Sequence, residues 1–60
     1  MKSKVEKINQ RLKDRIIFLE NSALEYRVVD DKQSARLCDV KAGQLQMVVD
    51  DLEQVLMEEN

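Results

Sequence analysis

Apolar residues recur with a regular spacing across residues 35–56, and this repeat constrains the fold more than any other feature of the sequence. The steps between them alternate between three and four residues without a break, and the members are Ala35, Cys38, Ala42, Leu45, Val49, Leu52 and Leu56. Such a heptad repeat places one apolar stripe along a helix and is typical of a helix that packs lengthwise against another helix. The sequence therefore predicts an all-α fold.

Residues 3–29 carry a second apolar stripe with almost the same spacing. Its steps are also three or four residues, with one phase slip at Ile16, and its members are Val5, Ile8, Leu12, Ile16, Leu19, Ala23 and Tyr26. This spacing predicts a second amphipathic helix. We therefore predict one domain over residues 1–60, with a helix at about 3–29, a turn at about 29–32 and a helix at about 32–58.

Polar residues predict where each helix begins. Ser3 is followed three residues later by Glu6, which is the spacing of a capping box. Asp30 and Gln33 have the same spacing, so we expect Asp30 to cap the second helix. No Gly or Pro lies between the two stripes, and one continuous helix therefore remains the alternative to two helices.

An antiparallel pairing brings the two stripes into register. Facing residues then have numbers with a constant sum, which is 61 for Val5–Leu56, Leu12–Val49, Ile16–Leu45, Leu19–Ala42, Ala23–Cys38 and Tyr26–Ala35, and 60 for Ile8–Leu52. Charge favours the same pairing, because residues 1–15 hold six basic and two acidic side chains, whereas residues 44–60 hold five acidic and no basic ones. The sequence therefore favours an antiparallel helical hairpin.

The chain is too short for one hairpin to bury a large core. A domain of sixty residues hides only about 60% of its unfolded surface and commonly depends on a disulfide, a metal or self-association. The single Cys excludes an internal disulfide, and the absence of His argues against a zinc site. We therefore expect a homodimer, in which two hairpins form a four-helix bundle.

Both predicted helices carry apolar residues outside their heptad stripes. On the first helix these residues are Ile17, Leu24 and Val28. On the second helix they are Leu37, Val40, Val48 and Val55. If exposed, such residues form patches of the kind that mark an interface. We expect a second copy of the chain to cover them, and the alternative is that one set receives a different protein.

A row of basic residues on the first helix ends at an aromatic residue. The spacing places the row on one outward face, and its members are Lys4, Lys7, Arg11, Arg15 and Phe18. These side chains could contact phosphates and stack on an unpaired base, or they could balance the acidic end of the second helix. Phe18 could also close the edge of a dimer or anchor a partner. We expect this row to be a partner-binding site.

The sequence argues against catalysis and cofactor binding. No His is present to activate a Ser or Cys, and neighbouring acidic residues on a helix point about 100° apart, so the adjacent acidic pairs do not converge. Cys38 lies on the apolar stripe, where a thiol acts as a small hydrophobe. No membrane span or signal peptide is apparent. We expect no enzyme activity, cofactor, metal or membrane partner, and a cytoplasmic location.

Gly43 lies beside the apolar stripe of the second helix. A glycine inside a helix costs about 1 kcal/mol relative to Ala. A close helix crossing or a local kink would explain its presence, and a tolerated surface position is the alternative.

Residues 30–39 resemble the plasmid-encoded Rop (RNA one modulator) family. The residues similar to that family's turn and to the start of its second helix are Asp30, Ala35, Leu37, Cys38 and Asp39. The resemblance implies a homodimeric bundle of hairpins, with RNA contacts from polar residues and a Phe on the exposed face of the first helix. The row from Lys4 to Phe18 is similar in kind to that face. The residues that depart from the family's apolar core layers are Arg15, Ser22, Ser34 and Lys41.

These observations favour a small protein-binding module without enzyme activity. Such a module would act as an adaptor, inhibitor or assembly factor of the kind that phages and mobile elements encode, and would present a helical face to a larger protein. The alternative is a small Rop-like regulator that binds RNA or DNA through the basic face of its first helix.

Overall fold

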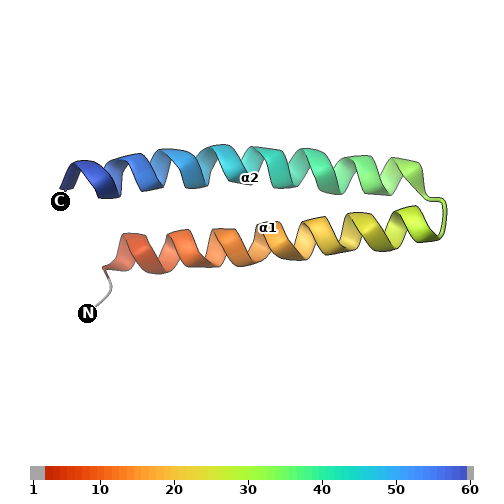
Figure 1. Cartoon of the computed structure of the whole chain (residues 1–60), viewed down its shortest axis with the longest axis horizontal. Coiled ribbons are helices and arrows are strands. Elements are labelled where there is room, and N and C mark those ends of the chain that lie inside the picture. Colours follow the sequence, from red (N-terminus) through yellow and green to blue (C-terminus); the bar gives the residue numbers. More distant parts are fainter. Residues whose placement is uncertain (1–2, 60) are drawn as a thin grey trace.

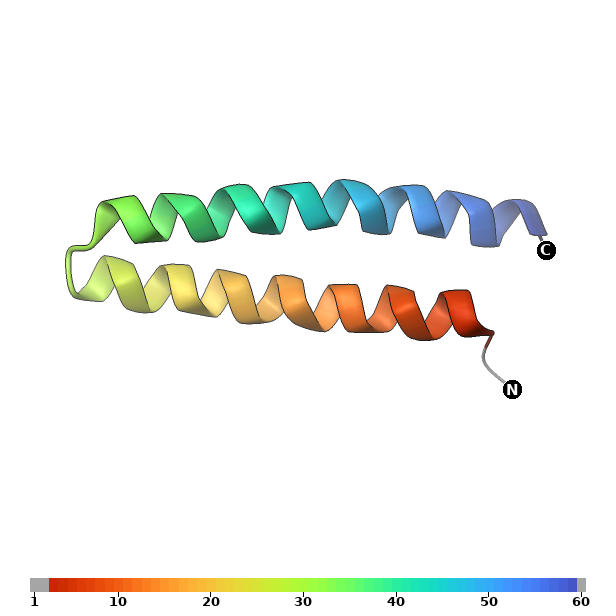
Figure 2. The same ribbon diagram turned by 180° about the vertical axis from the view of Figure 1, so that it is seen from behind.

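The computed structural model describes residues 3–59, which form two α-helices. Helix α1 spans Lys4–Val28 and helix α2 spans Lys32–Glu59. The two helices run antiparallel and lie side by side along their whole length (Figures 1 and 2). This arrangement confirms the predicted all-α hairpin and excludes one continuous helix. Neither helix contains a stretch long and apolar enough to cross a membrane, as far as the described residues extend.

A Schellman motif ends α1 and reverses the chain. Asp30 adopts the left-handed conformation with φ 61°, and its amide N–H donates to the Arg27 carbonyl over 3.1 Å. The Asp31 amide N–H donates to the Tyr26 carbonyl over 2.8 Å. These are the two hydrogen bonds of this motif, in which Gly usually takes the left-handed position and Asp or Asn sometimes replaces it. The turn therefore needs no Gly or Pro.

The cap of α2 differs from the prediction. Asp31, and not Asp30, accepts a hydrogen bond from the Ser34 amide N–H, over 3.1 Å at Oδ1. Asp30 cannot serve as the cap, because a capping residue has extended backbone angles whereas Asp30 is left-handed. At the start of α1 the predicted cap is present, since Ser3 Oγ accepts from the Glu6 amide N–H over 3.2 Å.

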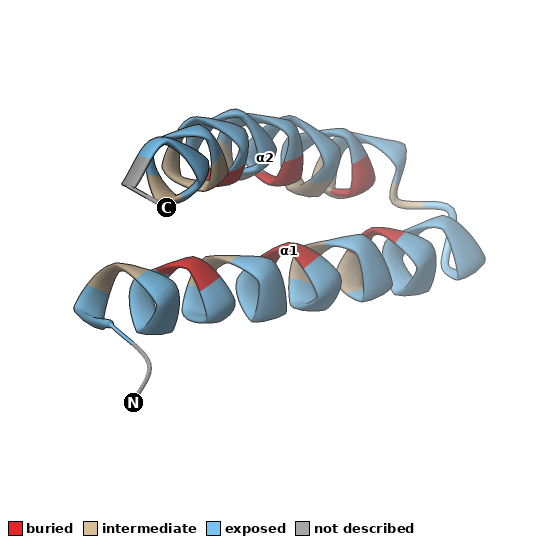
Figure 3. Ribbon diagram, turned by 60° about the vertical axis from the view of Figure 1, so that its left-hand side comes forward, coloured by how far each residue is buried: buried red, intermediate tan, exposed pale blue. Residues whose placement is uncertain are grey.

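The core of the hairpin lies along the two apolar stripes. Its buried members pack with three partly buried leucines, and together the cluster consists of Ile16, Ala42, Val49, Leu12, Leu19 and Leu45. These residues form the three central pairs whose numbers sum to 61. Nearer the turn, Ala23 and Ala35 are buried as well. Figure 3 shows the buried residues on the facing sides of the two helices, with exposed residues around them.

One position of the α1 stripe was predicted wrongly. Asn9 is buried, with 6% of its surface exposed, whereas the predicted Ile8 is 49% exposed. With Asn9 in place of Ile8, the stripe steps four, three, four and three from Val5 onward, and the phase slip at Ile16 disappears. Asn9 and Leu52 also sum to 61. The helix therefore follows its continuous geometric repeat, even though this repeat buries an amide and exposes an isoleucine.

The other exception on this stripe is Tyr26, which is 39% exposed. It lies in the last turn of α1, where the facing residue is the short Ala35. A large ring therefore finds little to pack against at this end of the stripe.

A matched pair of substitutions in α2 tests the core. Val49 is 1% exposed and Val40 is 51% exposed. We expect Val49→Ala to lower the free energy of unfolding by roughly 1.5–2.5 kcal/mol, because it removes two buried methyl-sized groups and leaves a cavity. Val40→Ala should change it by no more than about 0.5 kcal/mol. Urea unfolding followed by circular dichroism measures both, and equal effects would contradict this core.

Candidate interaction surfaces

The two predicted sets of surplus apolar residues are exposed on opposite faces of the hairpin. On one side, Phe18 of α1 and Lys41 of α2 border the same depression. Val48 and Val55 follow Lys41 at seven-residue intervals, which return a helix to nearly the same direction, so they lie on this side as well. We call this side the Val48 face, and its exposed apolar residues are Ile8, Phe18, Leu37, Val48 and Val55.

The opposite side carries a ridge of apolar residues on α1. Ile17 and Glu20 border a depression together with Gln46 of α2. Leu24 follows Ile17 by seven residues and Val28 follows one turn later, so all three point to this side. We call it the Leu24 face, and its exposed apolar residues on α1 are Ile17, Leu24 and Val28. Because the two faces are opposite, a single flat partner cannot cover both.

Val40 belongs to neither face. It lies two residues before the buried Ala42, and two residues along a helix turn the side chain by about 200°. Val40 therefore points away from α1, on the outer surface of α2, although the sequence pattern grouped it with Leu37, Val48 and Val55.

The predicted basic row lies on the Val48 face and is divided between two depressions. Lys4, Lys7 and Arg11 surround the exposed Ile8 in a shallow depression of about 220 Å³. Arg15 and Phe18 border the second depression, of about 400 Å³. All four basic side chains are exposed, and none forms an ion pair with another residue in the described part of the chain. The row thus lines two separate depressions, each of which combines basic and apolar side chains.

Helix α2 contributes to the larger depression in a way that the sequence analysis missed. Its lining residues are Leu12, Arg15, Phe18, Leu19, Lys41, Gln44 and Leu45. Lys41 brings a further positive charge beside Arg15, and Phe18, which is 68% exposed, forms part of the rim. The antiparallel register predicts that Lys41 lies near Leu19, because facing residues have numbers that sum to about 61 and these two sum to 60. The position of Lys41 could therefore have been inferred from the sequence. This depression combines apolar walls with two cations.

Gly43 lies on the Leu24 face. It precedes Gln46 by one turn of α2, on the side where Gln46 borders the same depression as Ile17. A Cβ atom added at Gly43 would meet nothing within 4 Å. No helix therefore crosses closely at Gly43 within the hairpin, and a close intramolecular crossing does not explain this glycine.

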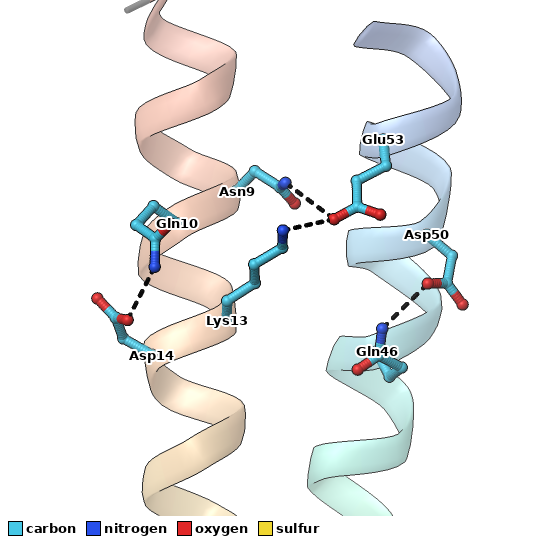
Figure 4. Close-up of polar contacts among 7 residues, drawn as sticks. All are labelled: Asn9, Gln10, Lys13, Asp14, Gln46, Asp50 and Glu53. Atoms are coloured by element: carbon cyan, nitrogen blue, oxygen red, sulfur yellow. Dashed lines mark hydrogen bonds and ion pairs between the residues drawn. The ribbon is translucent and has the colours of Figure 1, made fainter. Parts of the chain in front are cut away.

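A polar cluster joins the two helices near their open end (Figure 4). Lys13 Nζ lies 2.7 Å from Glu53 Oε1, and Asn9 Nδ2 donates a long hydrogen bond of 3.5 Å to the same oxygen. The hydrogen bond from Lys13 is the largest cause that lowers the pKa of Glu53 below its ordinary value of 4.5, and the hydrogen bond from Asn9 is the next largest. Asn9 Oδ1 is buried and accepts no hydrogen bond from any described residue. Asn9 is thus only partly satisfied.

A second pairing ties the helices together near the turn. Arg27 in the last turn of α1 donates to Asp39 of α2, and both side chains are about half exposed. Lys13–Glu53 and Arg27–Asp39 both run between the helices, so each joins residues that are far apart in the sequence. Exposed pairs of this kind add little to stability, but they favour the antiparallel orientation over a parallel one.

Side chains that could perform chemistry are dispersed. Within residues 3–59, no group of three His, Cys, Asp or Glu side chains is arranged to hold a metal ion. The free Cys38 is partly buried on the apolar stripe between the two helices, as predicted. Exposed apolar residues, by contrast, gather on the Val48 face and the Leu24 face. Comparison with protein-family models, with curated proteins and with solved structures finds no match to this chain.

Replacing Asn9 tests how much the buried amide lowers the free energy of unfolding. We expect Asn9→Leu to raise the free energy of unfolding by roughly 1–3 kcal/mol, because it completes the apolar stripe and removes an unsatisfied buried oxygen. Gln10→Leu, at the exposed neighbouring position, should change it by less than about 0.5 kcal/mol. Urea unfolding of both variants is the measurement. A loss of stability in Asn9→Leu would show that the bond to Glu53 outweighs the cost of burying the amide.

The lowered pKa of Glu53 predicts a pH dependence of stability. Because this pKa is lower in the folded than in the unfolded chain, the ionised carboxylate stabilises the fold above pH 4.5, and this contribution is lost as the pH falls through the folded value. Glu53→Gln should therefore show a smaller decrease in melting temperature on acidification than the native chain. Melting curves between about pH 6 and pH 3 measure this difference. Parallel pH profiles would contradict the role of Glu53.

Proposed function

We propose that this chain is a small protein-binding module without enzyme activity, which presents the Leu24 face to a larger protein. The observation that supports this function most directly is the exposure of large apolar side chains on two opposite faces. Leu24 is 57% exposed, and Ile17 and Val28 are exposed on either side of it. Contiguous exposed apolar residues at helical spacing are characteristic of surfaces that receive another helix.

The open surroundings of Gly43 fit a tolerated surface position, and they also leave room for a partner on the same surface. Gly inside a helix costs about 1 kcal/mol relative to Ala, and the open space around Gly43 shows that the hairpin itself does not require the glycine. A helix or strand of another protein that approaches closely at this position would require it, because Gly lets two backbones come near each other. Gly43 lies one turn before Gln46, which borders the same depression as Ile17, so we place the close approach and the apolar ridge on one face.

The charges around this face indicate what kind of segment it receives. Glu20 borders the depression beside Ile17, as does Lys13, whose charge is paired with Glu53. Asp50 follows Gly43 by seven residues on the same side of α2. Glu20 and Asp50 are exposed. A complementary partner segment therefore carries two or three apolar side chains in a row, flanked by Lys or Arg. An amphipathic helix with basic margins has this composition.

The alternative function is RNA or DNA binding through the basic row. It is supported by the exposure of Lys4, Lys7, Arg11 and Arg15 and by the absence of ion pairs from these side chains within the described chain. Phosphate contacts depend steeply on salt concentration, whereas an apolar ridge does not. Fluorescence anisotropy with mixed RNA and DNA at low and high salt separates the two functions, and tight, salt-sensitive binding would favour the alternative.

Two substitutions on the Leu24 face test the proposed function. A partner is first obtained by affinity capture from the source organism and then used for quantitative binding. We expect Leu24→Asp to weaken binding by at least about tenfold, because it places a charge in the centre of an apolar contact. Gly43→Ala should weaken binding while raising the melting temperature of the isolated chain, because Ala favours the helix by about 1 kcal/mol.

The matched control for these substitutions is Val40→Asp. It makes a comparable change at an exposed apolar residue outside both faces, and we expect it to leave partner affinity unchanged. Circular dichroism of each variant verifies that the helices remain. Equal binding by the native chain, Leu24→Asp and Gly43→Ala would contradict a role for this face.

A further inference from the structure

The charged residues that line the two depressions of the Val48 face are all basic. They are Lys4, Lys7, Arg11, Arg15 and Lys41. Within residues 3–59, none of these side chains forms an ion pair, whereas Lys13 and Arg27 are paired with Glu53 and Asp39. The chain as a whole has a net charge of −2, so the positive charge on this face is a local concentration. Such a surface attracts a negatively charged partner.

The larger depression exposes part of the core to a partner. Its volume is about 400 Å³, and its lining includes the core residues Leu12, Leu19 and Leu45, with the exposed Phe18 at the rim. These leucines are accessible because the hairpin is a single layer of helices, with a Cα trace that extends 45 × 19 × 10 Å. An apolar side chain of a partner can therefore pack against the core, between the two helices.

The smaller depression belongs to an aliphatic patch at the open end of the hairpin. Its apolar residue is Ile8, which is 49% exposed. Facing residues have numbers that sum to 61, so Val48 and Val55 of α2 face Lys13 and Glu6 of α1, and Ile8 lies between these levels along the axis. Both valines are exposed. The patch therefore draws on both helices.

The spacing of the two depressions fits a partner helix that lies along α1. Arg15, which lines the larger depression, follows Ile8 by seven residues, or two turns, which is roughly 10.5 Å. A second helix rises by the same amount per residue, so apolar side chains seven residues apart reach both depressions. The basic residues Lys4, Lys7 and Arg11 are spaced by three or four residues, and acidic side chains at this spacing on the partner can pair with them.

Neither a nucleic acid nor a second copy of the chain complements this face as well. Single-stranded nucleic acid stacks its bases on aromatic side chains, whereas the exposed apolar residues of this face include only one aromatic, Phe18, beside four aliphatic residues. A two-fold dimer sets the same surface of each copy against the other. Five cations would then meet the same five cations, and like charges across an interface are costly.

We infer that the Val48 face receives an amphipathic helix with acidic margins from another protein. The apolar side chains of this helix pack into the two depressions, and its Asp or Glu side chains lie beside the five basic residues. This inference goes beyond the proposed function, because it concerns the opposite surface and a partner segment of opposite charge. The hairpin then joins two helices of different charge, one on each side.

Fluorescence anisotropy with two labelled helical peptides tests the charge of the partner. Both peptides carry leucines seven residues apart, and they differ only in the flanking residues, which are Glu in one and Gln in the other. We expect the Glu peptide to bind at least about tenfold more tightly than the Gln peptide. A Glu peptide that binds no more tightly than the Gln peptide would overturn the inference.

Charge reversals locate this binding on the Val48 face. Arg15→Glu and Lys41→Glu should each weaken binding of the Glu peptide by at least about fivefold. The control is Arg36→Glu, which makes the same change of charge at an exposed residue near the turn, outside both depressions, and should change the affinity by less than about twofold. Equal weakening by all three variants would show attraction by net charge alone and would overturn the inference.

A matched pair of apolar substitutions tests the packing. Ile8 is 49% exposed and Val40 is 51% exposed. We expect Ile8→Ser to weaken binding of the Glu peptide by at least about fivefold and Val40→Ser to leave it unchanged, because Val40 lies outside both faces. Circular dichroism verifies that the helices remain in each variant. If Ile8→Ser had no effect, the contact would be purely electrostatic, and the inference would be wrong.

Two further measurements address the other occupants of this face. Mixed-sequence RNA that binds more tightly than the Glu peptide, and does so equally well after Ile8→Ser, would overturn the inference in favour of nucleic acid. A native dimer in sedimentation equilibrium that Val48→Asp dissociates would overturn it in favour of a second copy. Leu24→Asp should leave binding of the Glu peptide unchanged, so the failure of this inference and the failure of the proposed function are distinguishable.

Discussion

The packing of α1 against α2 along one apolar stripe is the interaction on which the rest of the structure depends. Each central layer pairs one residue of α1 with one of α2, as Ile16 pairs with Leu45 and Leu19 with Ala42. Because the core is only one layer deep, every other side chain of the hairpin lies at a surface or at an edge. The large apolar residues outside the stripe are exposed for this geometric reason, and they form the faces for which we propose an interaction.

The polar residues within this packing contribute to orientation more than to stability. Asn9 occupies a position of the stripe where an apolar residue would pack better, and its amide connects α1 to Glu53 of α2. A single buried Asn in a helical seam is known to fix register and orientation at a cost in stability. The ion pairs Lys13–Glu53 and Arg27–Asp39 also favour the antiparallel orientation. Parallel helices would separate all of these pairs.

The two faces with exposed apolar residues lie on opposite sides of the hairpin and differ in their charges. Here the charged residues that line the Val48 face are basic, whereas the Leu24 face is formed mainly by α1 and has the acidic Glu20 beside it. These chemical differences suit different partners, and we propose a basic amphipathic helix for the Leu24 face.

The sequence by itself determined the two helices, their antiparallel pairing and the central facing pairs, because heptad spacing and charge depend only on the order of residues. Tertiary structure decided that Asn9 replaces Ile8 in the core, since burial follows the continuous rotation of the helix and not the hydrophobicity of single residues. It also decided that Asp31 caps α2, because the reversal requires a left-handed Asp30. Finally, it placed Lys41 beside Phe18 and Gln46 beside Ile17. The repeat within one helix shows how far each side chain points from the apolar stripe of that helix. Only the pairing of the two backbones determines which residues of α1 and which residues of α2 lie on the same face of the hairpin.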